Sequence, residues 1–230
     1  MDLASAWEEH AASWIGWARA PGHDGFWDGT WPALRDIFPR PGGLVLDVGC
    51  GEGRLGRELT RLGHAVLGID RSKTLARAAA TGDGALVACA DAAALPLPDR
   101  CVATVAACMC LQDVDDLPGS VGEIARVLRP GGSICIALVH PLANCDADPS
   151  TPIGDEYVVS RPYLLSRRME ARVERDGLAM TFVSMHRPLS AYVAALTAAG
   201  LAVTDLREHG DGVVPWLLVM RAVLAGEAAG

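Results

Sequence analysis

Short apolar runs recur along the chain, and several of the segments between them carry helical periodicity. The runs are continuous rather than alternating, which is typical of parallel strands that are buried on both faces. They lie at residues 44–48, 65–70, 85–91, 102–108 and 133–139. Two intervening segments, 54–62 and 117–128, place their apolar side chains on one helical face. This alternation predicts an α/β fold, a Rossmann-like, doubly wound sheet with helices on both faces.

The C-terminal part completes this sheet with a different strand direction. Residues 189–199 show an amphipathic pattern that Gly200 stops, and apolar runs follow at 203–208 and 214–220. A short connection such as the one between these two runs joins antiparallel strands, because parallel neighbours need a long crossover. We therefore predict a seven-stranded sheet with an antiparallel C-terminal strand.

The N-terminal segment, residues 1–38, stands outside this pattern. Trp7, Trp14 and Trp17 share one helical face with His10. Such a stripe either docks a helix on the protein body or forms an aromatic lid over a bound ligand, and aromatic faces also suit a cation. We expect an N-terminal helical lid, with Arg19 just after its helix as the partner of a ligand carboxylate.

A second segment outside the pattern follows the fifth predicted strand, at residues 141–187. Residues 169–174 alternate with period two, Arg175-Asp176-Gly177 forms a turn, and residues 178–185 return. This is the pattern of a β-hairpin, and at this position a hairpin would cap a substrate pocket. Five arginines gather in and just before this hairpin, and we interpret them as its solvated face rather than as partners of an acidic substrate. They are Arg161, Arg167, Arg168, Arg172 and Arg175.

Composition limits the function classes. Half of the 230 residues are hydrophobic, which is enough for one domain with a sizeable core. The expected parts are a lid (1–38), a cofactor-binding core (42–140), a cap (141–187), a C-terminal helix with strands (188–222) and a tail (223–230). A net charge of −8 argues against nucleic acid and anionic membranes as partners.

Location and metal content are also constrained by the sequence. No apolar run approaches the roughly 20 residues of a membrane helix, and the N-terminus lacks a signal peptide's basic start. The seven cysteines fit free thiols in a cytoplasmic protein. No C-x-x-C pair occurs and the histidines are scattered, so we expect no metal site.

The segment from Asp47 to Gly53 runs from a strand into a glycine-rich turn. Gly51–Gly56 fits the dinucleotide pattern G-x-G-x-x-G, but the strand ends at Val48, so Gly56 already lies inside the following helix. The pattern Asp47-x-Gly49-x-Gly51-x-Gly53 instead resembles motif I of the class I S-adenosylmethionine-dependent methyltransferases. A carboxylate before the first glycine suits a cationic sulfonium and ammonium group, whereas it would repel phosphates.

Two further predicted strands end in a carboxylate. Asp70, at the tip of the second strand, is placed to accept the hydroxyl protons of a ribose. The resemblance implies that Asp91 accepts a hydrogen bond from the adenine amine and that Ala92 offers its backbone amide. The alternative is that these aspartates are only N-caps of helices. The predicted cofactor-binding residues are Arg19, Asp47, Gly49, Cys50, Gly51, Asp70, Arg71, Asp91, Ala92 and Cys108.

The resemblance implies methyl transfer from S-adenosylmethionine to a carbon, oxygen or nitrogen of a small organic molecule, a phenolic natural product being one example. The product is S-adenosylhomocysteine, and no metal is implied. His186-Arg187-Pro188 resembles an element of the small-molecule, ubiquinone/menaquinone-biosynthesis-like group (methyltransferase type 11). Residues 108–113 lack the Asn-Pro-Pro-aromatic motif of enzymes that methylate adenine, cytosine or glutamine amides.

A general base helps when the acceptor is a phenol, an alcohol or an activated carbon, and histidine commonly serves. We predict His186 or His140 as that base, with His10 third, and Gln112 and Asp113 as candidate substrate contacts. Two other functions stay open, an S-adenosylmethionine-binding protein without methyl transfer and an NAD(P)-dependent oxidoreductase. The expected partner is a small-molecule substrate, and the expected state is a monomer or homodimer.

Overall fold

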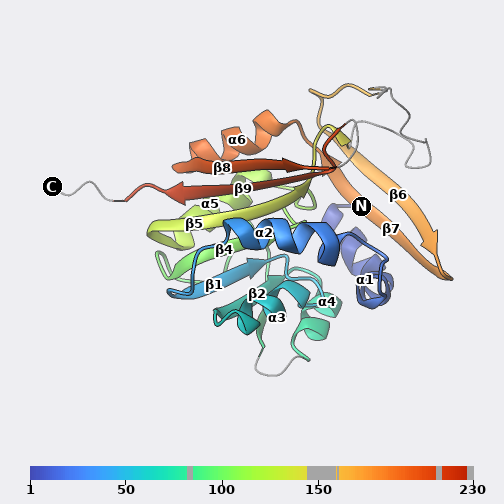
Figure 1. The fold of residues 1–230 in the computed structure, drawn as a ribbon, viewed down its shortest axis with the longest axis horizontal. Helices are drawn as coiled ribbons and strands as arrows, with labels where there is room; N and C mark the ends of the chain where they lie inside the picture. Colours follow the sequence, from blue (N-terminus) through green and yellow to red (C-terminus); the bar gives the residue numbers. More distant parts are fainter. Residues whose placement is uncertain (82–84, 144–158, 160, 211–213, 227–230) are drawn as a thin grey trace.

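The computed structural model describes residues 1–81, 85–143, 159, 161–210 and 214–226. Its centre is a seven-stranded sheet with the order β3-β2-β1-β4-β5-β9-β8 (Figure 1). The strands are β1 Leu44–Val48, β2 Ala65–Asp70, β3 Leu86–Cys89, β4 Val102–Cys108, β5 Leu128–Val139, β8 Leu201–His209 and β9 Leu217–Leu224. Neighbours among β1 to β5 are parallel, whereas β9 is antiparallel to both β5 and β8. The predicted sheet with an antiparallel C-terminal strand is confirmed.

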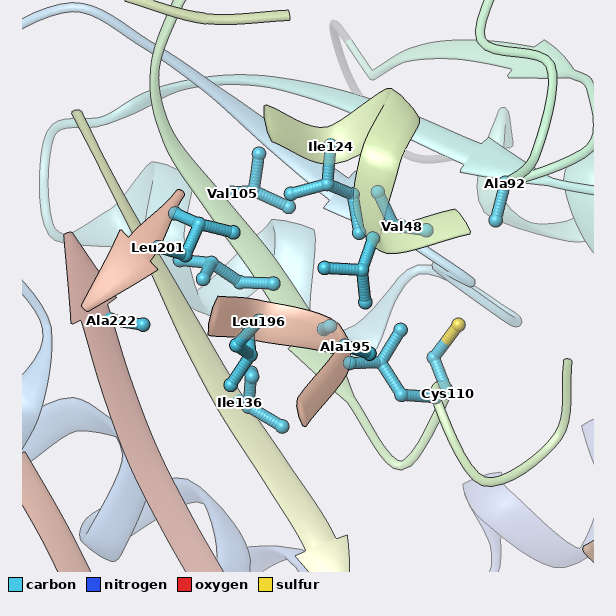
Figure 2. Close-up of a cluster of buried hydrophobic side chains, with 14 of the residues drawn as sticks. Val48, Ala92, Val105, Cys110, Ile124, Ile136, Ala195, Leu196, Leu201 and Ala222 are labelled. Carbon is cyan, nitrogen blue, oxygen red and sulfur yellow. The ribbon is translucent and has the colours of Figure 1, made fainter. Parts of the chain in front are cut away.

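Helices cover both faces of this sheet. The elements are the π-helical turn η1 Phe26–Thr30 and the helices α2 Trp31–Ile37, α3 Arg54–Arg61, α4 Lys73–Ala79, α5 Leu117–Val127 and α6 Leu189–Ala198. In β5 the side chains alternate between two apolar clusters, as the period of a strand requires. Ile136 joins Ile124 of α5 and Leu196 of α6 in the larger cluster (Figure 2). Cys135 joins Leu34 of α2 and Leu59 of α3 in the cluster on the opposite face.

Strand β5 begins earlier than the sequence pattern predicts. The apolar run predicts a strand at 133–139 preceded by a turn at Pro130-Gly131-Gly132, but β5 already pairs with β4 through Leu128 and Val102. The register then shifts before Thr104 meets Ser133. The glycine segment is therefore an irregularity inside a strand. A bulge satisfies the same preference of glycine for unusual backbone angles that a turn does.

The hairpin is present as β6 Arg167–Arg175 and β7 Leu178–His186. Its two-residue turn is Asp176–Gly177, with φ of 50° and 77°, the positive angles of the turn type that matches strand twist. Helix α1, Leu3–Arg19, packs along β7 between the hairpin and the main sheet (Figure 1). Residues 144–158 and 160 of the predicted cap, and 227–230 of the predicted tail, lie outside the described residues.

Candidate cofactor and acceptor site

A cavity of about 200 Å³ lies at the carboxyl ends of the parallel strands. This is where open α/β sheets bind ligands, at the point where the strand order reverses between β1 and β4. Helix α1 and η1 contribute Trp7, Trp14 and Phe26 to its wall. Nine predicted cofactor residues also line it, namely Asp47, Gly49, Cys50, Gly51, Asp70, Arg71, Asp91, Ala92 and Cys108.

The loop after β1 borders the cavity with glycine backbone atoms that carry no Cβ. Gly49 has φ of 67°, and a Cβ at this position would lie 2.7 Å from the Cβ of Cys110. The amides of Gly49 and Cys50 donate to the carbonyl of Ile69 at 2.8 and 3.0 Å, which fixes the loop against β2. Glycine is required here both for the backbone angle and for the space.

Asp47 is the buried carboxylate under this loop. It is 1% exposed, and its Oδ2 has no hydrogen-bond partner. Burial and the nearby charge of Asp70 raise the pKa of Asp47 to about 7, opposed by a hydrogen bond from the amide of Gly56. A buried carboxyl group with a spare oxygen favours a cation beside it.

Asp70 connects two neighbouring loops. Its Oδ2 accepts from the amide of Gly51 and its Oδ1 from the amide of Ser72, both at 2.8 Å. Asp70 is not the N-cap of α4, since Ser72 holds that position and accepts from the amide of Leu75. Asp47 lies inside β1, and Gly53 precedes α3. The alternative in which these two aspartates merely cap helices is therefore excluded.

Asp91 and Arg71 meet at the β2–β3 end of the cavity. The Oδ1 of Asp91 accepts from the amide of Ala93 at 2.9 Å, and its Oδ2 lies 3.0 Å from Nη1 of Arg71. Both side chains are partly exposed. They therefore form a polar rim where a heterocycle with donors and acceptors would be held.

Arg19, His140 and His186 do not line this cavity, and neither does His10. Arg19 is the last residue of α1 rather than a residue beyond it, and its Nε lies 3.0 Å from Oε2 of Glu52. Each of the two predicted catalytic histidines contacts a group elsewhere: His140 Nε2 lies 2.8 Å from Oε1 of Glu208, and His186 Nε2 lies 2.8 Å from the carbonyl oxygen of Tyr163. Burial lowers the pKa of His186, which favours its neutral form.

Asp113, expected only as a candidate substrate contact, has a buried Oδ1 without a partner. It lines the cavity on the loop after β4, and burial raises its pKa well above the usual range, opposed by the charge of Arg187. Arg187 anchors that loop by donating to the carbonyls of Val114 at 2.6 Å and Leu111 at 3.3 Å. Gln112 helps by accepting from the amide of Val139 at 2.9 Å.

Helix α1 is attached to three of the loops that form the cavity. Its first amide, that of Leu3, donates to Oδ1 of Asp115 at 3.0 Å, in the loop after β4. In its middle, Glu8 accepts from the hydroxyl and amide groups of Thr74 and from the Ser72 hydroxyl, after β2. At its end Arg19 pairs with Glu52, after β1. The helix thus spans the carboxyl edge of the sheet.

The hairpin supports the outer side of α1. The indole of Trp7 donates to the carbonyl of Val183 at 3.0 Å, and the ring of Phe182 meets Trp14 and Trp17 edge to face. No described residue of β6 or β7 lines the cavity. The tryptophan stripe therefore does two things, since it docks the helix against the hairpin and also presents Trp7 and Trp14 to the cavity.

Sequence comparison identifies related proteins. A family model described as a methyltransferase domain matches residues 46–136. The malonyl-[acyl-carrier protein] O-methyltransferase of Pectobacterium atrosepticum is 37% identical over 108 residues, 45% of this chain and 42% of that protein. The sterol 24-C-methyltransferase ERG6B of Gibberella zeae is 30% identical over 193 residues, 79% of this chain and 46% of that protein. The chain thus spans less than half the length of these two curated relatives.

Structure comparison agrees over a longer stretch. An S-adenosylmethionine-dependent methyltransferase from Mesorhizobium loti superposes with a TM-score of 0.69 and 27% identity. The match covers 85% of this chain and 99% of that one. Together with the glycine loop and the strand order, these similarities show that the chain belongs to the class I S-adenosylmethionine-dependent methyltransferases. The cofactor of this class is S-adenosylmethionine.

The residues of the cavity fit this cofactor. The unpartnered Oδ2 of Asp47 suits a ligand that carries sulfonium and ammonium charges, and the bare glycine loop admits close approach. Asp70 and Asp91 add carboxylates on the β2–β3 side for hydroxyl and amine donors. Among the described residues, no group of three or more His, Cys, Asp or Glu side chains is arranged to hold a metal ion. Nor does any described helix combine the length and apolar character needed to cross a membrane.

Proposed function

We propose that this chain transfers a methyl group from S-adenosylmethionine to a carbon, oxygen or nitrogen atom of a small organic molecule. The observation that carries the proposal is the cavity in which the glycine loop meets the carboxylates of Asp47, Asp70 and Asp91. Phenolic natural products are the first acceptors to test. We further propose a cytoplasmic location and a monomeric or homodimeric state. Analytical ultracentrifugation of the full chain would distinguish the monomer from the homodimer.

In this proposal the ribose lies at Asp70 and the adenine at Asp91 and Ala92. Gly49, Cys50 and Gly51 pass close to the ligand through their backbone, and Arg71 completes the rim beside Asp91. When bound, the cofactor supplies an electrophilic methyl group on a sulfonium that becomes a neutral thioether on transfer. The protein has chiefly to place the acceptor atom in line with that methyl group.

The remaining cavity wall gives the acceptor its surroundings. Trp7 and Trp14 enclose the cavity from α1, and Asp113 faces it from the loop after β4. Aromatic faces stabilise the positive charge of a sulfonium methyl group and exclude water.

An acceptor hydroxyl or amine must lose a proton as its electron pair forms the new bond to the methyl carbon. We propose that Asp113 or one of the histidines His140 and His186 receives this proton and later releases it to water. Asp113 is the one of the three that faces the cavity with an unpartnered oxygen. Burial raises the pKa of its carboxyl group, opposed by the charge of Arg187.

The proposed function is tested by calorimetry with S-adenosylmethionine, S-adenosylhomocysteine and NADH, followed by turnover with a panel of phenols, amines and activated carbon acids. Formation of S-adenosylhomocysteine only in the presence of an acceptor supports methyl transfer. Tight cofactor binding without turnover on any acceptor favours the binding-protein alternative, and preferential binding of NADH favours the oxidoreductase.

The base is identified once an acceptor is found. Asp113→Asn, His140→Asn and His186→Asn are compared, and replacing the base lowers turnover by roughly 10²–10⁴-fold while cofactor affinity stays unchanged. If all three variants keep wild-type turnover from pH 6 to 9, positioning alone carries the reaction and no base is involved.

A further inference from the structure

Arg54 is the cationic side chain at the β1–β4 end of the cavity. Of the described residues that line the cavity, the two arginines are Arg54 and Arg71, and Arg71 is at the opposite end beside Asp91. Arg54 is the first residue of α3, directly after the glycine loop. Its side chain is 12% exposed, so its charge is largely removed from water.

The guanidinium of Arg54 lies over two aromatic rings. Its Cζ lies 4.1 Å from the ring centre of Phe26 and 5.1 Å from that of Trp14. Stacking of this kind fixes the plane of the guanidinium and leaves its edge to meet an anion. Trp14 also borders the glycine loop, because a Cβ on Gly51 would lie 3.3 Å from its indole nitrogen.

The charge of Arg54 is paired within the protein, but one of its buried donors is not aligned with an acceptor. Its Nη1 lies 2.7 Å from Oδ2 of Asp24, yet this buried nitrogen has no partner in hydrogen-bonding geometry. A buried donor without an aligned acceptor is costly, and a ligand carboxylate can supply the aligned pair of acceptors that Asp24 does not.

The strand order indicates which part of the cofactor reaches Arg54. Asp91 follows β3, Asp70 ends β2, and Gly49 to Gly51 follow β1, so these groups lie in sequence along the sheet edge. With the adenosine at Asp91 and Asp70, the other end of an extended ligand points toward β1 and β4. Cys108 ends β4 and lines the cavity, as does Arg54 directly after the glycine loop that follows β1.

We propose that Arg54, rather than Arg19, binds the α-carboxylate of the cofactor's amino-acid end. This inference rests on the proposed function, because it assumes that S-adenosylmethionine occupies the cavity. Arg19 is half exposed, lies outside the cavity lining and pairs with Glu52, whose other oxygen accepts from Arg57 at 2.6 Å. A carboxylate on the acceptor would be the other ligand that Arg54 could recognise.

The test measures binding of S-adenosylmethionine and of decarboxylated S-adenosylmethionine, two ligands that differ only in the carboxylate. Calorimetry compares the wild type with Arg54→Gln, and Arg61→Gln serves as a matched control because Arg61 is exposed on the same helix and pairs with Glu58. We expect Arg54→Gln to lower the affinity for S-adenosylmethionine by about tenfold or more, the scale of a charge-assisted pair. The affinity for the decarboxylated ligand should fall by less than about twofold. Arg54→Lys keeps the charge without the planar fork and recovers part of the loss.

The outcomes separate the alternatives. If Arg54→Gln weakens both ligands equally, Arg54 only supports the site. If the substitution weakens binding of neither ligand, the partner of Arg54 is Asp24 or a carboxylate on the acceptor. Equal weakening and no weakening each overturn the inference. If the wild type binds neither ligand, the proposed function itself fails. Binding of the decarboxylated ligand by Arg54→Gln shows that the variant is folded.

Discussion

The two ends of the cavity are built in different ways. The end at which we propose that adenosine binds (the adenosine end), formed by Gly49–Gly51, Asp70 and Asp91, is held by backbone amides: Gly51 and Ser72 donate to Asp70, and Ala93 donates to Asp91. The lid end, formed by α1, η1 and Arg54, is held by side chains far apart in sequence. Glu8 reaches Ser72 and Thr74, and Trp7 reaches Val183.

This difference predicts a rigid part and a part that opens. Short strands and their loops are fixed by the parallel sheet, which is buried on both faces, whereas the contacts that tie α1 to the cavity loops are polar and several are exposed or partly exposed. Polar ties at a surface contribute little each, so the lid end is the less stable of the two. We expect a bound cofactor to enter and leave through such a part.

The largest effect is expected at the rigid end, from Gly49→Ala. The new Cβ would meet Cys110, and the residue would need φ of 67°. Left-handed strain costs about 1–2 kcal/mol and overpacking about 1–3 kcal/mol, so we expect about 3 kcal/mol of lost stability by denaturant unfolding. Gly131→Ala is the matched control, because Gly131 has φ of 74° and open space around it. It should lose only the stability that the backbone strain costs. Equal losses in the two variants would show that the contact with Cys110 is relieved without cost.

The second effect tests whether Asp47 is retained for the ligand at the expense of stability. Because the pKa of Asp47 is raised to about 7, its ionisation in the folded protein is disfavoured, and stability falls as pH rises from about 4 to 7. Asp47→Asn should therefore stabilise the ligand-free protein at pH 8 by about 2 kcal/mol, and much less at pH 4. The same variant should bind S-adenosylmethionine more weakly. Thermal unfolding across pH measures the first effect, and a gain that does not depend on pH would contradict the assignment.

The contrast between the two ends also explains what the sequence could predict. The glycine loop, Asp47 and Asp70 lie next to strands whose apolar runs are visible directly, so their meeting at one sheet edge follows from the fold class alone. Arg54 carried a usable signal as the first helical residue after the third glycine. No sequence pattern predicts its stacking on Phe26 or its contact with Asp24, because both depend on the path of residues 20–30.

Two short helices and the contacts of two histidine side chains also could not be predicted from the sequence. Helix α4 and helix α2 have seven residues each, too few for a periodic pattern to stand out. His140 and His186, the predicted general bases, flank the predicted cap. The ends of β5 and β7 place their side chains against Glu208 and Tyr163. Position at a strand end places the backbone at the sheet edge and leaves open which neighbour the side chain meets.

At the adenosine end, Asp70→Ala should weaken S-adenosylhomocysteine binding by about tenfold or more, the scale of one or two charge-assisted hydrogen bonds. The substitution also removes the acceptor of the Gly51 and Ser72 amides, so the loops themselves lose a tie. Calorimetry measures the affinity, with the exposed Asp36→Ala as control. An unchanged affinity would overturn the ribose role of Asp70.

The smallest effect is expected at the lid end, from Glu8→Ala. Glu8 ties α1 to the start of α4, and these hydrogen bonds lower the pKa of its carboxyl group, so the tie holds at neutral pH and is lost only as pH falls through that lowered value. Loss of a surface tie worth about 0.5–1 kcal/mol should speed S-adenosylhomocysteine dissociation roughly two- to fivefold in stopped-flow tryptophan fluorescence. Glu9→Ala, at the exposed neighbouring position, should leave the rate unchanged. If both variants release the ligand at the wild-type rate, α1 does not control its exit.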